Sequence, residues 1–235
     1  MDARPGVLET IRGQLVVSCQ ALRGMPFDAP ELIAELARAA ELGGAAAVRV
    51  NRPENIRAVR RVVGLPIIGL FKQGDGPVYI TPTLDTAMAC VDAGTDMVAT
   101  DATARPRPGG EQLSAIVSAV HGAGVAVLGD VGGVEDALFA QDQGVDAVAT
   151  TLRGHTGVRA PSPLAQLDAL VRHVRIPVIM EGGVTSPRMA RQAIEHGAWS
   201  VVVGRAITMP HFITQMYVRT IARLQERTVQ DDDDA

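Results

Sequence analysis

The chain has 235 residues, a length typical of one large α/β domain, and its 47% of hydrophobic residues can form a sizeable core. The formal charge is −4, and the four aspartates at positions 231–234 account for all of it, so the body of the chain is near neutral. Aromatic residues make up only 3%, which together with this charge excludes a basic or base-stacking nucleic-acid surface. We therefore expect one domain over residues 1–228, an acidic disordered tail over 229–235, and no nucleic-acid or membrane partner.

The two cysteines, Cys19 and Cys90, lie in apolar runs and have no metal-ligand spacing, which predicts buried reduced thiols. No apolar run reaches the length of a membrane span, and the amino terminus lacks the apolar core of a signal peptide. These features lead us to expect a cytoplasmic protein.

Two periodicities alternate along the chain. Short apolar runs bounded by glycine, proline or polar residues predict eight strands, at 15–20, 45–50, 66–71, 96–101, 125–130, 146–151, 176–181 and 200–204. Apolar residues at helical spacing predict one leading helix and a helix after each strand, at 5–12, 30–42, 53–63, 82–93, 110–121, 134–143, 164–174, 187–196 and 210 to about 227.

A repeat supports this count of units. Glycines that end helices recur about every 50 residues, a spacing of two strand–helix units, at Gly43, Gly94, Gly144 and Gly197. Eight such units predict a single (β/α)8 TIM barrel with a parallel sheet. An open doubly wound sheet is the alternative, but it needs a glycine-rich turn after the first strand, where this chain has none.

The predicted strands end in polar residues although their interiors are almost entirely apolar. The eight end residues are Gln20, Arg49, Lys72, Asp101, Asp130, Thr151, Glu181 and Gly204. Chemistry in a barrel of this type takes place where the strands end, so this set predicts a functional site on one face.

Two of these residues suggest acid–base chemistry. Glu181 follows an apolar strand where a carboxylate has little structural use, although a salt bridge or a helix cap is also possible. Lys72 ends another apolar strand, and partial burial would lower its pKa toward the working range of a base, whereas a surface lysine is the competing interpretation. They lie four strands apart and could flank a carbon skeleton from two faces, which suits proton transfer next to a carbonyl.

Glycines and one histidine suggest how a substrate could be held. Gly182 and Gly183 follow the seventh strand and Gly204 ends the eighth, where backbone amides commonly bind phosphate, although glycine also serves simple turns. His155 follows the sixth strand, and whether it touches substrate stays open. No histidine accompanies the carboxylates at ligand spacing, so we expect neither a metal nor another cofactor.

Eight motifs lie in order along nearly the whole chain, from about Gly6 to Ile221. They are Val17-Ser-Cys-Gln-Ala-Leu22, Val48-Arg-Val-Asn51, Ile68-Gly-Leu-Phe-Lys72, Val78-Tyr-Ile-Thr-Pro-Thr83, Ala99-Thr-Asp-Ala-Thr103, Thr150-Thr-Leu152, Pro177-Val-Ile-Met-Glu-Gly182 and Val201-Val-Val-Gly204. Together they resemble the N-acetylmannosamine-6-phosphate 2-epimerase family.

The resemblance implies interconversion of N-acetylmannosamine 6-phosphate and N-acetylglucosamine 6-phosphate, which brings sialic acid carbon into amino-sugar metabolism. It implies a phosphorylated N-acetylhexosamine as substrate, and we also expect a homodimer. In the family a lysine and a glutamate exchange the C2 proton, and they correspond to Lys72 and Glu181. The substrate-holding residues and the phosphate glycine correspond to Gln20, Arg49, Asp130 and Gly204.

The chain departs from the family pattern at several positions. Met209 stands where the family has a substrate-binding arginine, an arginine occurs instead at Arg205, and His155 replaces a tyrosine. We expect Arg205, with Thr151 and His155, to contact substrate, while the identity of the sugar stays open, and a related phosphosugar is a possible substrate. Two further hypotheses are a Schiff-base aldolase that uses Lys72 and a phosphosugar-binding barrel without turnover.

Overall fold

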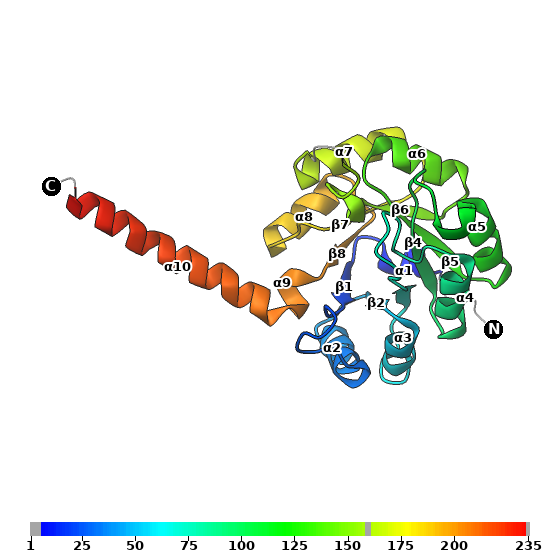
Figure 1. Ribbon diagram of the computed structural model, residues 1–235, viewed down its shortest axis with the longest axis horizontal. Coiled ribbons are helices and arrows are strands. Elements are labelled where there is room, and N and C mark those ends of the chain that lie inside the picture. The colour runs from blue at the N-terminus through cyan, green and yellow to red at the C-terminus, as the bar shows by residue number, and fades with distance from the viewer. Residues whose placement is uncertain (1–5, 158–160, 234–235) are drawn as a thin grey trace.

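Eight parallel strands form a closed barrel in sequence order in this computed structural model, which describes residues 6–157 and 161–233 (Figure 1). The strands are β1 (Leu15–Cys19), β2 (Ala47–Asn51), β3 (Ile67–Leu70), β4 (Met97–Asp101), β5 (Ala126–Asp130), β6 (Ala147–Ala149), β7 (Val178–Glu181) and β8 (Ser200–Val203). The predicted single barrel is confirmed, and the open sheet is wrong because β1 pairs with both β2 and β8.

Helices alternate with the strands, and all of them except the first and the last surround the barrel (Figure 1). They are α1 (Val7–Ile11), α2 (Pro30–Leu42), α3 (Pro53–Arg60), α4 (Leu84–Asp92), α5 (Leu113–Gly122), α6 (Val134–Asp142), α7 (Pro163–His173), α8 (Pro187–Glu195), α9 (Arg205–Thr208) and α10 (Pro210–Asp233). Two short 3-10 turns, η1 (Pro108–Gly110) and η2 (Thr150–Leu152), and the four-residue α9 were not predicted. Proline at the first position of α2, α3, α7 and α8 favours helix initiation there.

Alternation along the strands creates two apolar layers. One layer fills the space between the sheet and the helices, and it contains the buried thiols of Cys19 and Cys90. The predicted burial of both thiols is confirmed, and burial raises the pKa of each to about 12. The second layer fills the barrel interior with residues such as Ile68, Leu128 and Ile179. A barrel of this size has a packed interior and is not a pore.

The amino ends of the strands are covered by α1. Ile11 is fully buried in the interior layer, and the indole Nε1 of Trp199 donates a 2.8 Å hydrogen bond to the carbonyl of Leu8. The guanidinium of Arg12 stacks on the Trp199 ring at 4.6 Å. This end of the barrel is therefore closed, and the opposite end carries the loops.

The last helix leaves the barrel. α10 begins at Pro210 and extends away from the ring of helices (Figure 1). It continues to Asp233, so the predicted division at residue 228 falls within this helix, and the disordered tail stays a prediction. Over the described residues, no helix combines the length and the apolar character that crossing a membrane requires.

Candidate active site

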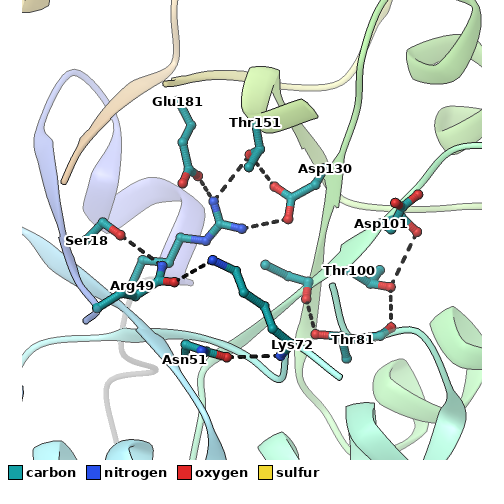
Figure 2. A network of polar contacts seen from close by, with 12 residues as sticks. Ser18, Arg49, Asn51, Lys72, Thr81, Thr100, Asp101, Asp130, Thr151 and Glu181 are labelled. Atoms are coloured by element: carbon teal, nitrogen blue, oxygen red, sulfur yellow. Dashed lines mark hydrogen bonds and ion pairs between the residues drawn. The ribbon is translucent and has the colours of Figure 1, made fainter. Parts of the chain in front are cut away.

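Arg49 is the centre of a polar cluster inside the mouth of the barrel (Figure 2). Its guanidinium is 1% exposed and donates to Asp130 Oδ2 at 2.6 Å and to Thr151 Oγ1 at 3.3 Å. It also forms a close ion pair with Glu181. The strands explain this convergence, because Arg49, Asp130 and Glu181 each lie two residues beyond an inward-facing apolar residue on β2, β5 and β7.

Lys72 lies at the same end of the barrel, on the side opposite Glu181. It continues the inward alternation of β3, and β3 and β7 lie four strands apart in the closed barrel. Its Nζ donates a 3.0 Å hydrogen bond to Oε1 of Gln20, and Nε2 of Gln20 donates to Ser18 Oγ at 2.9 Å. Desolvation by the surrounding mouth, with the charges of Arg49 and Arg205 and against that of Asp130, lowers the pKa of Lys72 to about 8, although the residue itself is exposed to solvent. The lowered pKa brings this amine closer to the range in which a side chain can act as an acid or a base.

The two carboxylates of the cluster are fixed by different contacts. Asp130 is fully buried, and desolvation raises its pKa although Arg49 and a close hydrogen bond from Thr151 oppose the change. Glu181 has a side chain that is 13% exposed at the mouth. Its backbone is held by Thr150, whose hydroxyl donates to the Glu181 carbonyl at 2.8 Å and accepts from the Glu181 amide at 3.0 Å.

Asp101 also lies at a predicted strand end, but its side chain binds residues of the loop that follows β4 and not the Arg49 cluster. Its carboxylate accepts from the amide and hydroxyl of Thr103 at 3.0 and 2.7 Å and from Arg105 at 2.7 Å. Among the described side chains, no three histidine, cysteine, aspartate or glutamate residues lie together as metal ligands. The buried aspartates Asp101 and Asp130 are paired with arginines.

The three candidate phosphate glycines differ in their surroundings. A Cβ on Gly183 would lie 2.9 Å from Pro163 Cγ, and a Cβ on Gly204 would lie 3.2 Å from the Cβ of Ser18, so packing alone favours glycine at both positions. Gly182 has a φ angle of +86°, and nothing lies within 4 Å of where its Cβ would be. Glycine is therefore favoured at this position by the left-handed backbone conformation and not by packing. The phosphate role of these glycines stays a prediction.

The remaining candidates lie at the edge of the mouth. Arg205 opens α9, its guanidinium lies 5.5 Å from the Phe212 ring, and its charge acts on Lys72. Met209 follows the end of α9. His155 is exposed, and no hydrogen bond in the described residues links its side chain to the cluster. The substrate contacts of Arg205 and His155 therefore stay predictions.

Several residues that support the cluster were missed from the sequence. Asn51 accepts from the backbone amide of Lys72 at 3.0 Å, Ser18 anchors Gln20, and Thr150 holds Glu181. These residues adjoin the predicted strand ends by one or two positions. One strong signal was available in the composition, because Lys72 is the only lysine among the 22 lysine and arginine residues of the chain.

A cavity of about 520 Å³ opens next to Lys72, between the loops that follow β1, β2 and β3. Its lining includes Asn51, Arg52 and Phe71. The Lys72 amine, with its lowered pKa, and the Glu181 carboxylate come from opposite strands of the barrel, and the buried guanidinium of Arg49 pairs with Glu181. This arrangement can move protons to and from carbon while Arg49 stabilises negative charge that develops on oxygen.

A family model described as "Putative N-acetylmannosamine-6-phosphate epimerase" matches residues 33–223. A relative named "Putative N-acetylmannosamine-6-phosphate 2-epimerase" from Thermosynechococcus vestitus is 46% identical over 217 residues, which cover 90% of this chain and 94% of the relative. A relative with the same name from Clostridioides difficile is 38% identical, and the match covers 92% of this chain and 99% of the relative.

Solved structures agree with these sequence matches. The N-acetylmannosamine-6-phosphate 2-epimerase from Clostridium perfringens superposes with a TM-score of 0.90 at 36% identity, over 94% of this chain and 98% of that chain. A thiamine phosphate pyrophosphorylase from Pyrococcus furiosus has a TM-score of 0.61 at 19% identity, over 85% of this chain and 89% of that chain, a similarity of fold alone.

Proposed function

The chain belongs to the N-acetylmannosamine-6-phosphate epimerase family, and from this premise we propose how its mouth performs the epimerase reaction. The substrate pair is N-acetylmannosamine 6-phosphate and N-acetylglucosamine 6-phosphate, which differ in configuration at C2. The observation that supports this function is the placement of Lys72 and Glu181 on opposite strands around the buried Arg49. Two proton carriers on opposite sides allow removal of a proton from one face and its return to the other.

The proposed mechanism proceeds through the open-chain sugar, whose C2 proton is acidic because it lies next to the C1 carbonyl. One of the two groups removes this proton, and the electron pair moves onto the carbonyl oxygen. The other group then delivers a proton to the opposite face of C2. Lys72 and Glu181 exchange these roles when the reaction runs in reverse, and each contributes about 10²–10⁴-fold to the rate.

The other residues of the mouth bind the substrate in this proposal. Arg49 stabilises the oxyanion of the intermediate, and Asp130 and Thr151 keep its guanidinium fixed. The proposed substrate-binding set is Gln20, Arg49, Asp130, Thr151, His155 and Arg205, with phosphate held by Gly182, Gly183 and Gly204. No metal or other cofactor takes part in this scheme.

Proton NMR in D₂O tests this function with a panel of N-acetylhexosamine 6-phosphates. We expect loss of the C2 proton signal together with appearance of the epimer, most rapidly for N-acetylmannosamine 6-phosphate. The unphosphorylated sugars are the control for phosphate binding, and equal turnover of them would contradict the phosphate site. Binding without exchange on the whole panel would instead indicate a phosphosugar-binding barrel.

The Schiff-base hypothesis is tested on the same protein. Borohydride would trap the substrate as a covalent adduct on Lys72, and no second lysine competes for it. We expect no adduct and undiminished activity after treatment.

We also propose a homodimer in which α10 packs on a second copy of the chain. After β8 the barrel receives only the four-residue α9, whereas α2 to α8 each contain eight residues or more. α10 extends away from the barrel and exposes Met216, Tyr217, Val218 and Ile221 (Figure 1). Leu32 and Ile207, exposed on α2 and α9, offer apolar surface where a partner's helix would complete the ring.

Sedimentation of purified protein tests this assembly. The wild-type chain should sediment as a dimer, and Tyr217→Glu with Ile221→Glu should convert it to a monomer by placing charge in the apolar contact. Arg219→Glu is the matched control, because residue 219 lies on the opposite side of the helix from 217 and 221. A monomeric wild-type protein would contradict the proposal.

The location of the protein follows from its chemistry, and we propose the cytoplasm. Phosphorylated sugars are intracellular metabolites, and the free thiols of Cys19 and Cys90 suit a reducing compartment.

A further inference from the structure

Thr81 occupies an unusual position in the loop between β3 and α4. It is fully buried and has φ +43, a left-handed conformation that β-branched residues rarely adopt. Its hydroxyl donates to the carbonyl of Ala99 at 2.6 Å and accepts from the amide of Phe71 at 3.0 Å. Backbone strain of this kind persists only where the surrounding contacts enforce it, and it concentrates near functional sites.

The Thr81 hydroxyl takes the place of a backbone hydrogen bond between β3 and β4. β3 and β4 pair only at Ile68 with Met97 and at Gly69 with Val98. If that register continued, the Phe71 amide would donate directly to the Ala99 carbonyl, as in any parallel ladder. The Thr81 hydroxyl stands between these two groups and satisfies both. The two strands are therefore bridged by a side chain immediately before Lys72.

The same segment also holds the backbone of Lys72 directly. Lys72 forms an antiparallel bridge with Ile80, the Gln73 amide donates to the Tyr79 carbonyl at 2.9 Å, and the Thr81 amide donates to the Phe71 carbonyl at 3.0 Å. On the other side of Thr81, the hydroxyl of Thr100 donates to its carbonyl at 2.9 Å (Figure 2). Residues 79–81 thus fix Lys72 to both its own strand and β4.

We infer that Thr81 is a positioning residue for Lys72: its inserted hydroxyl sets the separation of β3 and β4 and thereby the place of the Lys72 amine in the mouth. This inference rests on the proposed role of Lys72 as a proton carrier. Thr81 lies behind the strand end and does not touch the reacting carbon. Displacement of an acid–base group by about 1 Å can lower a rate by about 10²-fold, so fixing this strand end has a direct effect on turnover.

The test compares Thr81→Val, Thr81→Ser and Thr95→Val. Valine keeps the shape of threonine and removes the hydroxyl, and serine keeps the hydroxyl. Thr95→Val is the matched control, because the Thr95 hydroxyl also bridges β3 and β4, at their amino ends, through the carbonyls of Ile67 and Met97. Selective ¹³C labelling of lysine gives a single side-chain signal, so the pKa of Lys72 can be measured in each variant.

We expect Thr81→Val to lower kcat by about 10–100-fold, with little change in KM, and to raise the pKa of Lys72 from about 8 toward its ordinary value. Thr81→Ser should recover most of kcat and restore the pKa. Thr95→Val should lower the melting temperature without changing either quantity.

Three results would overturn the inference: wild-type kcat and pKa in Thr81→Val, no rescue by serine, or an equal loss of kcat in Thr95→Val. If Thr81→Val does not fold, Thr100→Val replaces it, since that change removes the bond to the Thr81 carbonyl. It should shift kcat and the pKa in the same directions by smaller amounts, and unchanged values would equally contradict the inference. Lys72→Ala tests the role of Lys72 separately from that of Thr81. Activity in this variant would refute the proposal that Lys72 is a proton carrier.

Discussion

The two ends of the barrel use charged residues in opposite ways. At the amino ends of the strands, Arg60 pairs with Asp96 and His196 pairs with Asp168, and all four side chains are between 33% and 44% exposed. At the carboxyl ends, Arg49 pairs with Asp130 and Glu181 almost entirely out of water. Exposed pairs contribute little to stability, whereas removing one partner of a buried pair leaves an uncompensated charge.

This difference shows what the fold requires and what the chemistry requires. The amino end is closed by α1 and would tolerate loss of its surface pairs. The carboxyl end carries desolvated charges that a stable barrel does not need and that the proposed proton transfer would use. Four single substitutions and one double change test this contrast, from the largest expected effect to the smallest.

Lys72→Met and Glu181→Gln should each lower kcat by at least about 100-fold, because each removes one of the two proposed proton carriers. Both variants should remain folded, as measured by circular dichroism, since neither side chain is part of the apolar layers. Proton NMR would follow both epimer formation and C2 exchange. If either variant kept more than about a tenth of the wild-type kcat, that residue would not be a required acid or base.

Arg205→Ala should lower kcat/KM for N-acetylmannosamine 6-phosphate by about 10–100-fold, the equivalent of one charge-assisted hydrogen bond. The expectation follows from the hypothesis that Arg205 supplies the charge of the arginine that we expect the family to have at the position of Met209. The double change Arg205→Ser with Met209→Arg should restore the lost activity. If the Arg205→Ala enzyme kept wild-type activity, the hypothesis that Arg205 compensates for the missing arginine at position 209 would be wrong. A double variant with lower activity on the best sugar would indicate a pocket for another substrate.

The same Lys72→Met variant should be more stable than the wild type. The pKa of Lys72 is about 8 in the folded chain and 10.5 as the ordinary value, so between these values the unfolded chain binds more protons and stability rises with pH. Below about pH 8 the destabilisation by Lys72 is at its full value. Urea unfolding at pH 7 should show a gain of at most about 1 kcal/mol, well below the full value of the pKa shift, because Lys72 is exposed and solvent screens its charge. The gain should shrink as the pH approaches 10.5, and a gain independent of pH would contradict the lowered pKa.

His196→Ala, at the amino end, should change least. Its exposed pair with Asp168 contributes about 0–1 kcal/mol, so the melting temperature should fall by a few degrees at most. Turnover should equal that of the wild type, because this pair lies at the end of the barrel opposite the mouth. A loss of kcat in this variant would show that the two ends of the barrel are coupled.

The sequence predicted the barrel well because each strand and helix has a local pattern. α2 matches its predicted bounds of 30–42, and the strand ends fall within about two residues of those expected. The same kind of pattern predicted the convergence of Arg49, Asp130 and Glu181. Alternation along each strand turns these side chains inward, and closure of the parallel barrel brings the strand ends to one mouth. The convergence of Thr151 and Gln20 on this cluster also followed from their places at strand ends.

Other features depend on contacts between distant segments. Thr81 and Thr150 act through hydrogen bonds to the backbone of neighbouring strands, which no local pattern encodes. Gly183 and Gly204 were predicted to bind phosphate, but the packing of Pro163 and Ser18 against them appears only in three dimensions. The direction of α10 also lacked a local signal, because its apolar residues would suit packing on its own barrel or on a partner.

The solitary lysine has a consequence for covalent chemistry. Acylating reagents react with lysine side chains and leave arginines unmodified, and in most proteins the surface lysines absorb such damage harmlessly. This chain carries arginine everywhere else and so offers no decoy side chain. Its one lysine amine has a lowered pKa and is therefore more often neutral and nucleophilic than an ordinary lysine. A single acyl transfer there would remove the proton carrier, so inactivation should follow the modification of that lysine one for one.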